Sequence, residues 1–428
     1  MKGQIQYLFR DKKIFSWALY DWANSAFATT VMAGFFPVLY REYFHAGESA
    51  EVISFHYGLT NSLASFFVAF CAPFLGALAD KRRGAKSYLV GFTLLGVLST
   101  VLIAFLGKGD WLAASGTFAL SLVGFSGAIV FYDALLPSVS NRGNIDWVSS
   151  FGYSLGYLGG GILFALNVWF VGAKETFGIE DQSFAMQLCF VSVGVWWLAF
   201  SLPLFRTLPE KEGTPSPLFE TLKDSVRETI STLSEIRKFR HVFLFLVAYW
   251  FYMDGVNSVM RLAVSYGVSI GFDSTDLIKA LLVTQFVGFP AALVFGALGS
   301  RFGSRPLIVV GIAGYLIATV LASLMSSVTH FYLLAIFVGL FQGGVQALSR
   351  SYYGSLIPQE KSAEFFGFYN LVGKCTAILG PTAVGILGVW LHSDRLGILA
   401  LAGLFAAGGG FLLFVREERA DTDRIPGS

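Results

Sequence analysis

Long apolar runs follow one another along almost the whole chain, and they decide what it can fold into. A helix that crosses a membrane needs about 20 mainly apolar residues, and such windows recur through the 428 residues. A mean hydropathy of +0.63 and a charged share of only 14% exclude an ordinary soluble protein. We therefore expect an all-α membrane protein. Its twelve predicted transmembrane helices cover residues 14–40, 55–79, 86–107, 111–136, 148–172, 184–206, 241–268, 276–299, 306–327, 330–357, 362–391 and 394–415.

The basic residues are unevenly divided among the loops between these runs. Most of the 30 Lys and Arg side chains lie at the two ends of the chain and after the even-numbered helices. Cytoplasmic loops of membrane proteins carry such an excess of basic residues. The pattern predicts that both termini face the cytoplasm. The net charge of +2 gives no sign of a nucleic-acid partner.

One long polar stretch separates six predicted helices from the next six. It covers residues 207–240 and places Leu, Val and Ile near helical spacing between charged side chains. This pattern is typical of an amphipathic helix on a membrane surface. We expect one six-helix bundle over residues 1–206, the linker over 207–240, and a second bundle with a short tail over 241–428.

Three short matches in the same order relate the two halves. They pair YDWANSAF at 20–27 with YMDGVNSVM at 252–260, GALADKRRGAK at 76–86 with GALGSRFGSR at 296–305, and YDALLP at 132–137 with YGSLIP at 353–358. The first match repeats one polar pattern, because Asp, Asn and Ser recur at the same spacings. The two aspartates, Asp21 and Asp254, therefore lie in corresponding helices, which face each other in transporters built from repeats.

The six-plus-six arrangement and its basic turns resemble the major facilitator superfamily over the full chain. The loop signature of that superfamily places an acidic and several basic residues between two glycines, after the second helix. In the second copy of the signature, Ser300 replaces the acid. The resemblance implies two bundles that rock against each other, with gating residues at the cytoplasmic side. The residues that we expect in gating are Gly76, Asp80, Lys81, Arg82, Gly84, Arg142, Arg301 and Arg350.

Within that superfamily, three stretches resemble the autophagy-related vacuolar effluxer branch and its bacterial relatives. They are WALYDWANSAF at 17–27, QALSRSYYGSLIP at 346–358 and EFFGFYNLVGKCTAILGP at 364–381. The resemblance implies export of amino acids. It also implies a place in the cell (inner) membrane of a bacterium.

The seventh predicted helix carries a polar stripe. An ionised Asp at the centre of a membrane helix costs about 2.5–3.5 kcal/mol on insertion scales, so it normally faces water or a partner. Asp254, Asn257, Ser258 and Arg261 follow at spacings of three, four and seven, which places them on one face. One interpretation is a zwitterion site, with Asp254 near an ammonium and Arg261 near a carboxylate. The other is an ion pair that only ties helices together.

Asp21 lies only eight residues after Lys13, and two roles for it stay open. As a coupling carboxylate, it would take up a proton during transport; Asp254 is the second candidate for this role. Alternatively, Asp21 pairs with an arginine of the cytoplasmic side, such as Arg142 or Arg350, and locks one conformation.

Four further polar residues are candidate substrate contacts. Lys374 and Asn370 share a helix face at a spacing of four, and Lys374 either neutralises one of the aspartates or extends its amine toward the membrane surface. Asn24 accompanies Asp21 in the first helix. Gln346 is the fourth, although glutamines in membrane helices more often bond to a neighbouring helix.

These features predict a secondary active transporter that moves a small polar solute by alternating access, with proton coupling left open. The chain has no GxxxxGK[ST] loop for ATP, and we identify no catalytic cluster, cofactor site or metal site. We expect no enzyme, and a monomer whose partners are its solute and membrane lipid. The alternatives are a carrier of lipids or hydrophobic drugs, which 43 Phe residues would suit, and a receptor or scaffold without transport.

Overall fold

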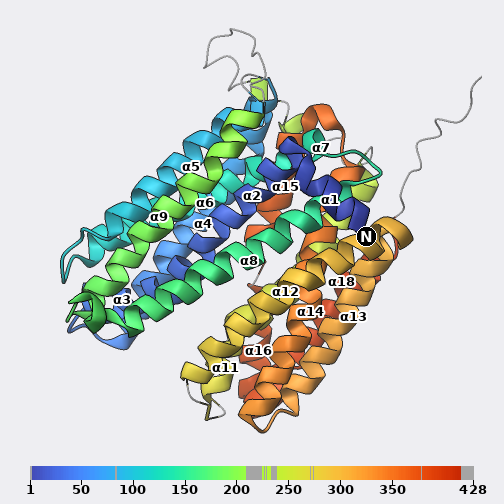
Figure 1. Cartoon of the computed structure of the whole chain (residues 1–428). Helices are drawn as coiled ribbons and strands as arrows, with labels where there is room; N and C mark the ends of the chain where they lie inside the picture. Colours follow the sequence, from blue (N-terminus) through green and yellow to red (C-terminus); the bar gives the residue numbers. More distant parts are fainter. Residues whose placement is uncertain are drawn as a thin grey trace, which may run out of the picture.

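The structure is a computed structural model. It describes residues 2–81, 84–208, 224–225, 227, 229–232, 239–269, 271–272, 274–376 and 378–415. Every regular element in these residues is helical (Figure 1). Eleven helices in the described part are long and apolar enough to cross a membrane.

The helices before residue 208 form the N-terminal half. Their bounds are α1 Lys2–Arg10, α2 Lys12–Ala26, η1 Phe27–Phe35, α3 Phe36–Leu39, η2 Tyr40–Phe44, α4 Ala50–Lys81, α5 Gly84–Ile103, α6 Trp111–Ala134, α7 Leu136–Val139, α8 Ile145–Gly172, η3 Lys174–Phe177 and α9 Gln182–Thr207. The helices after residue 239 form the C-terminal half. Their bounds are α11 Arg240–Ser269, α12 Ser274–Phe302, α13 Ser304–Ser323, α14 Val328–Leu356, η4 Gln359–Lys361, α15 Ser362–Lys374, α16 Leu379–Trp390, α17 Asp394–Gly397 and α18 Ala400–Leu412.

The first predicted helix is longer and less regular than its apolar run indicates. Asp11 caps α2 by accepting hydrogen bonds from the backbone N–H groups of Lys13 at 2.9 Å and Ile14 at 3.2 Å. The helix then continues without a gap through η1, α3 and η2, and η1 and η2 are π-helical. This segment is not one of the eleven long helices, so the prediction of twelve crossings stays an expectation.

The predicted span over residues 362–391 lies within the apolar stretch Gln359–Leu391, which is long enough to cross a membrane, but it is not one continuous helix. It is broken, because α15 ends at Lys374 and α16 begins at Leu379. Pro381 explains part of the break: proline has no N–H and clashes with the preceding turn, but it fits the first turn of a new helix. Pro381 is the third residue of α16.

Only part of the predicted linker can be compared with the structure. Residues 224–225, 227 and 229–232 of the expected amphipathic helix are helical. The rest of that helix lies outside the described residues.

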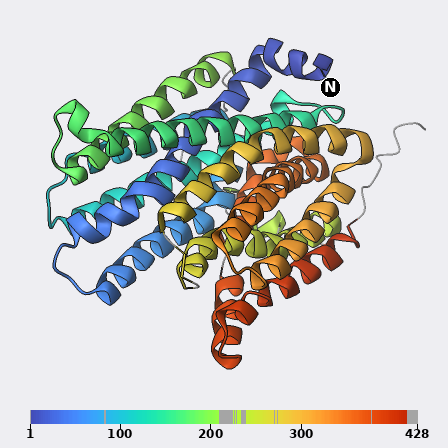
Figure 2. The same cartoon turned by 60° about the horizontal axis from the view of Figure 1, so that its bottom comes forward.

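The two halves lie side by side in both views (Figures 1 and 2). Three pairs of helices form most of the interface: α8 packs along both α12 and α14, and α4 packs along α15. Within the N-terminal half α8 also packs closely against α2, because glycines of α8 leave room for it. A Cβ at Gly156 would lie 2.8 Å from Ser25 Oγ, and one at Gly160 would lie 3.0 Å from the Ser25 carbonyl oxygen.

Candidate functional site

A buried arginine joins the two halves. Arg350 of α14 has only 2% of its surface exposed, and its guanidinium meets two carboxylates of the N-terminal half. Its Nη1 lies 3.1 Å from Asp133 Oδ1 and 3.5 Å from Asp21 Oδ2. The sequence offered Arg142 or Arg350 as the partner of Asp21, and the structure places Arg350 there. Arg142 is exposed.

The remaining donors of Arg350 are also used across the interface. Its Nε donates to Ser149 Oγ at 3.0 Å, and its Nη2 donates to the Ser149 carbonyl oxygen at 2.9 Å. Its guanidinium carbon lies 4.8 Å from the centre of the Trp17 ring and 4.3 Å from that of Tyr153. Such contacts between a cation and an aromatic ring strengthen when water is excluded.

The two aspartates each have a second partner. The hydroxyl of Tyr132 donates to Asp21 Oδ2 at 3.2 Å, and Asn370 Nδ2 donates to Asp133 Oδ2 at 3.3 Å. We call Asp21, Asp133 and Arg350 the charge cluster. With all three groups ionised, the charge cluster has one negative charge in excess.

Asp254 occupies a different place from its repeat partner Asp21. It is fully buried, and its carboxylate accepts backbone hydrogen bonds from Ile378 at 3.2 Å, Leu379 at 3.0 Å and Gly380 at 2.6 Å. These N–H groups belong to the start of α16, where a negative charge is favourable. Ser258 Oγ adds a bond to Asp254 Oδ1 at 3.2 Å. Asp254 therefore holds the break between α15 and α16 against α11.

The other residues of the α11 stripe separate from Asp254. Asn257 donates to Thr376 Oγ1 at 2.6 Å, inside the break. Arg261 is exposed, and it forms no ion pair with Asp254 or with another described residue. The structure thus brings Asp254, Asn257 and Ser258 to the helix break, and leaves Arg261 one turn beyond.

The remaining candidate contacts lie on both sides of the interface. Lys374, the last residue of α15, donates to Ser126 Oγ of α6 at 2.7 Å. Gln346 Oε1 accepts a hydrogen bond from the Tyr157 hydroxyl at 3.0 Å. Asn24 is buried, and its side-chain NH₂ has no partner among the described residues.

The predicted gating motif lies where α4 meets the start of α15. The Asp80 carboxylate accepts hydrogen bonds from the backbone N–H groups of Ala363 at 3.2 Å and Glu364 at 2.9 Å. Gly76 faces the same turn, and a Cβ on it would overlap the Ala363 carbonyl oxygen. Gly84 begins α5 with a positive φ of 74°, which favours glycine. We call the end of the molecule that contains this contact between Asp80 and residues 363–364 the closed end.

A second set of contacts fixes the closed end on the opposite side. Asp146, at the start of α8, accepts hydrogen bonds from Ser304 Oγ at 2.8 Å and Ser351 Oγ at 2.5 Å. In the second copy of the loop motif Ser300 replaces the acid, and here the acid comes from the facing helix instead. Among the other gating candidates, Lys81 and Arg301 are exposed. Arg82 lies outside the described residues.

Sequence reasoning missed Asp133, Ser149 and Asp146. A signal for Asp133 existed, because it is an acidic residue inside an apolar run and its repeat partner is Gly354. The serine and Asp146 gave no comparable signal, since their roles depend on a helix that is far away in the sequence.

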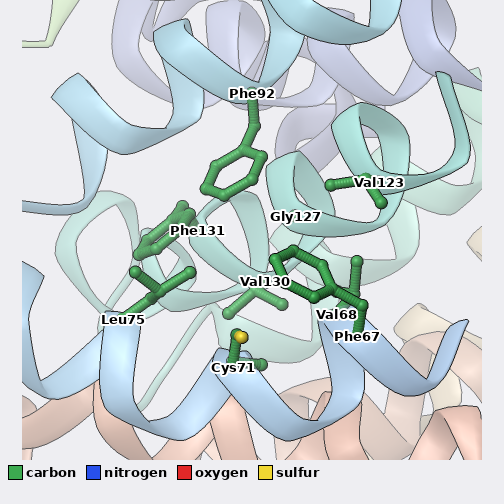
Figure 3. A pocket seen from close by; sticks show the side chains of 10 residues that line it. Phe67, Val68, Cys71, Leu75, Phe92, Val123, Gly127, Val130 and Phe131 are labelled. Atoms are coloured by element: carbon green, nitrogen blue, oxygen red, sulfur yellow. The ribbon is translucent and has the colours of Figure 1, made fainter. Parts of the chain in front are cut away.

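An apolar pocket among α4, α5 and α6 is a poor candidate for a polar solute. Figure 3 shows side chains from these helices converging on it, among them Phe67, Cys71, Phe92 and Phe131. Its lining has no charged side chain, so it offers nothing to bind a polar group. The charge cluster and the break between α15 and α16 remain the candidate sites, because charged and polar side chains gather there.

Two sequence comparisons relate the chain to known proteins. The sequence model of the family described as "Vacuole effluxer Atg22 like" matches residues 10–146 and 140–424. The MFS-type transporter YxiO of Bacillus subtilis is 36% identical over 406 residues, which cover 94% of each chain. Autophagy-related protein 22 of Yarrowia lipolytica is 25% identical over 320 residues, covering 67% of this chain and 53% of that protein.

A solved structure shows the same fold. The human organic anion transporter MFSD10 (TETRAN) superposes with a TM-score of 0.73, over 94% of this chain and 99% of that one, at 13% sequence identity. The helical architecture is thus that of a major facilitator superfamily transporter.

Proposed function

The chain belongs to the Atg22-like vacuole effluxer family within the major facilitator superfamily, and on this premise we propose how it works as a secondary transporter. The proposed carrier moves a small polar solute by alternating access. The direction that the family description favours is export, and the solute that we propose is an amino acid. The two halves, residues 1–206 and 241–428, would rock about the interface on either side of the linker.

The observation that carries this proposal is the buried bridge from Arg350 to Asp21 and Asp133. An alternating-access carrier needs a contact between its halves that exists in one state and breaks in the other. The bridge joins α14 of one half to α2 and α6 of the other at 3.1–3.5 Å. It would therefore stabilise the state in which the closed end is shut.

The charge cluster also supports coupling to protons. Burying an unpaired charge is strongly unfavourable, and two carboxylates face one guanidinium. In our proposal Asp21 or Asp133 takes a proton while the cluster is buried and loses it when the closed end opens to water. The second expected proton carrier, Asp254, is occupied by three backbone N–H groups, so Asp21 is the better candidate.

The charge pattern of the loops supports an orientation. We propose that the closed end faces the cytoplasm of a bacterium, with the protein in the inner membrane as a monomer. This end carries the start of the chain and the turn after α4, where the basic residues gather.

The first test is transport by the purified protein in proteoliposomes. Counterflow of a labelled amino-acid panel would be measured with and without a pH gradient, for the unmodified protein and Asp21→Asn. We expect saturable counterflow that responds to the gradient, and a weaker response in Asp21→Asn. Glu48→Gln, which neutralises an exposed acid outside the proposed sites, is the matched control. Flux that ignores the gradient in both proteins would reject proton coupling, and absence of any saturable flux would reject the carrier.

A further inference from the structure

Two cations near the interface lack carboxylate partners. Lys374 at the end of α15 donates only to Ser126 Oγ of the opposite half, at 2.7 Å. Arg261 of α11 has no ion pair or hydrogen bond among the described residues. By contrast, Arg350 forms ion pairs with Asp21 and Asp133.

The two cations converge on one place. Arg261 follows Asn257 by one helical turn, and Asn257 bonds to Thr376, two residues after Lys374, at 2.6 Å. Lys374 itself reaches Ser126 of α6 in the opposite half. These contacts place both cations beside the break between α15 and α16, next to the N-terminal half.

Asp254, the acid that could neutralise these cations, already binds other groups. Asp254 shares the α11 stripe with Arg261, but its two oxygens accept bonds from the start of α16 and from Ser258. Two neighbouring cations repel each other, and an anion between them relieves the repulsion. A guanidinium can bind a carboxylate through two parallel hydrogen bonds.

We infer that Lys374 and Arg261 form the subsite for an anionic group of the transported solute, and that none of the described residues beside them is reserved for an ammonium. The inference rests on the proposed carrier function and names what the carrier recognises. An amino acid then binds through its carboxylate, and the same carbon skeleton without the amino group binds at least as well. An anionic lipid headgroup offers the same chemistry, so the test must separate it from a solute.

The test uses compounds that share a skeleton. Alanine, pyruvate and ethylamine form one set, and leucine, 4-methyl-2-oxopentanoate and 3-methylbutylamine form a larger one. Inhibition and counterflow would be measured in phosphatidylcholine vesicles, and thermal stabilisation in detergent. We expect the oxo acids to match or exceed the amino acids and the amines to be inactive. Lys374→Gln and Arg261→Gln should each raise the half-saturating concentration about tenfold or more.

The controls are variants that remove a cation outside the proposed subsite. Lys279→Gln and Arg41→Gln remove exposed cations elsewhere and should change nothing. Activity of the amines, a need for the ammonium, or unchanged affinity in both variants would overturn the anion subsite. Thermal stabilisation by oxo acids without flux would keep the subsite and reject the carrier function. If no compound is transported and none raises the melting temperature of the protein, the subsite is rejected.

The lipid source has its own arm. Phosphatidylglycerol would be added to the vesicles and to the detergent. If it inhibits counterflow and stabilises the unmodified protein but not Lys374→Gln, a headgroup occupies the cations and the solute assignment is wrong. Equal counterflow with and without phosphatidylglycerol supports the solute.

Discussion

At the scale of the residue, Arg350 does what a lysine at the same position could not. Its planar fork reaches the Ser149 hydroxyl, the Ser149 carbonyl and Asp133 in three directions at once. It also lies against aromatic rings of Trp17 and Tyr153. Removing the guanidinium from this buried network leaves two uncompensated carboxylates, which costs more than the lost bonds alone.

Arg350→Gln should therefore destabilise the protein strongly. It leaves Asp21 and Asp133 buried together without a cation, at a cost of about 3–5 kcal/mol. Asp21→Asn should cost much less, because it leaves one carboxylate for one guanidinium. The melting temperature in detergent checks this order. A loss of stability in Asp21→Asn as large as in Arg350→Gln would contradict the charge account.

At the scale of the element, the break between α15 and α16 is the least regular feature of the interior. The end of α15 carries Lys374, and the start of α16 faces Asp254. A cation at a helix C-terminus and an anion at an N-terminus both suit the helix dipole. Lys374 and Asp254 thus each stabilise the end of one of the two helices, α15 and α16 respectively.

Asp254→Asn tests this role in α16. The amide keeps one oxygen but loses the charge and half of the accepting capacity, so we expect a loss of about 1–2 kcal/mol. The affinity for solute should stay within about twofold, because Asp254 does not contact it in our proposal. Melting temperature and counterflow, measured on the same preparation, separate the two effects. Unchanged stability with lost affinity would return Asp254 to the solute site.

The contact of α4 with α15 depends on a missing side chain. A Cβ at Gly76 would overlap the Ala363 carbonyl oxygen and come within 2.8 Å of Glu364 N. Gly76→Val should keep the closed end from shutting fully. Gly58→Val is the matched control in the same helix, since nothing lies within 4 Å of its position.

Alkylation of a cysteine placed at Ser362 reads out this change, with Cys71, Cys189 and Cys375 replaced by serine. We expect faster alkylation with Gly76→Val and an unchanged rate with Gly58→Val. Equal rates in both variants would show that the glycine is dispensable for closure.

Most helices could be predicted from the sequence, because a membrane helix needs an uninterrupted apolar run. The break between α15 and α16 could not, since the apolar run continues through it and only Pro381 indicated it. The pairing of Asp21 with Arg350 was one of two stated alternatives. Asp133 and the capping role of Asp254 were missed, because each depends on a partner more than 100 residues away.

At the scale of the whole molecule, the two halves close unequally despite their repeated sequence. On one side Asp80 at the end of α4 binds the start of α15. On the other side the acid is Asp146 at the start of α8, and its partners are serines of α13 and α14. Two sets of hydrogen bonds with different partners therefore hold the closed end shut, and both sets must break when it opens.

A disulfide across the contact between α4 and α15 should stop transport. Asp80→Cys combined with Ala363→Cys, in the protein without its native cysteines, would tie α4 to α15 after oxidation. We expect counterflow to fall to background and to return on reduction with dithiothreitol. Each single variant serves as the control. Full counterflow in the oxidised double variant would show that the closed end does not open during transport.

Asp80 and Asp254 bind mainly backbone N–H groups, and this bears on how sequences of the family can vary. The N–H groups of residues 363, 364, 378 and 379 are present with every side chain except that of proline. Other substitutions at these four positions can accumulate without a compensating change in the aspartates. We therefore expect little covariation across these contacts in relatives. We expect strong constraint on the acids and on the glycines that leave room for the contacts, Gly76 and Gly380.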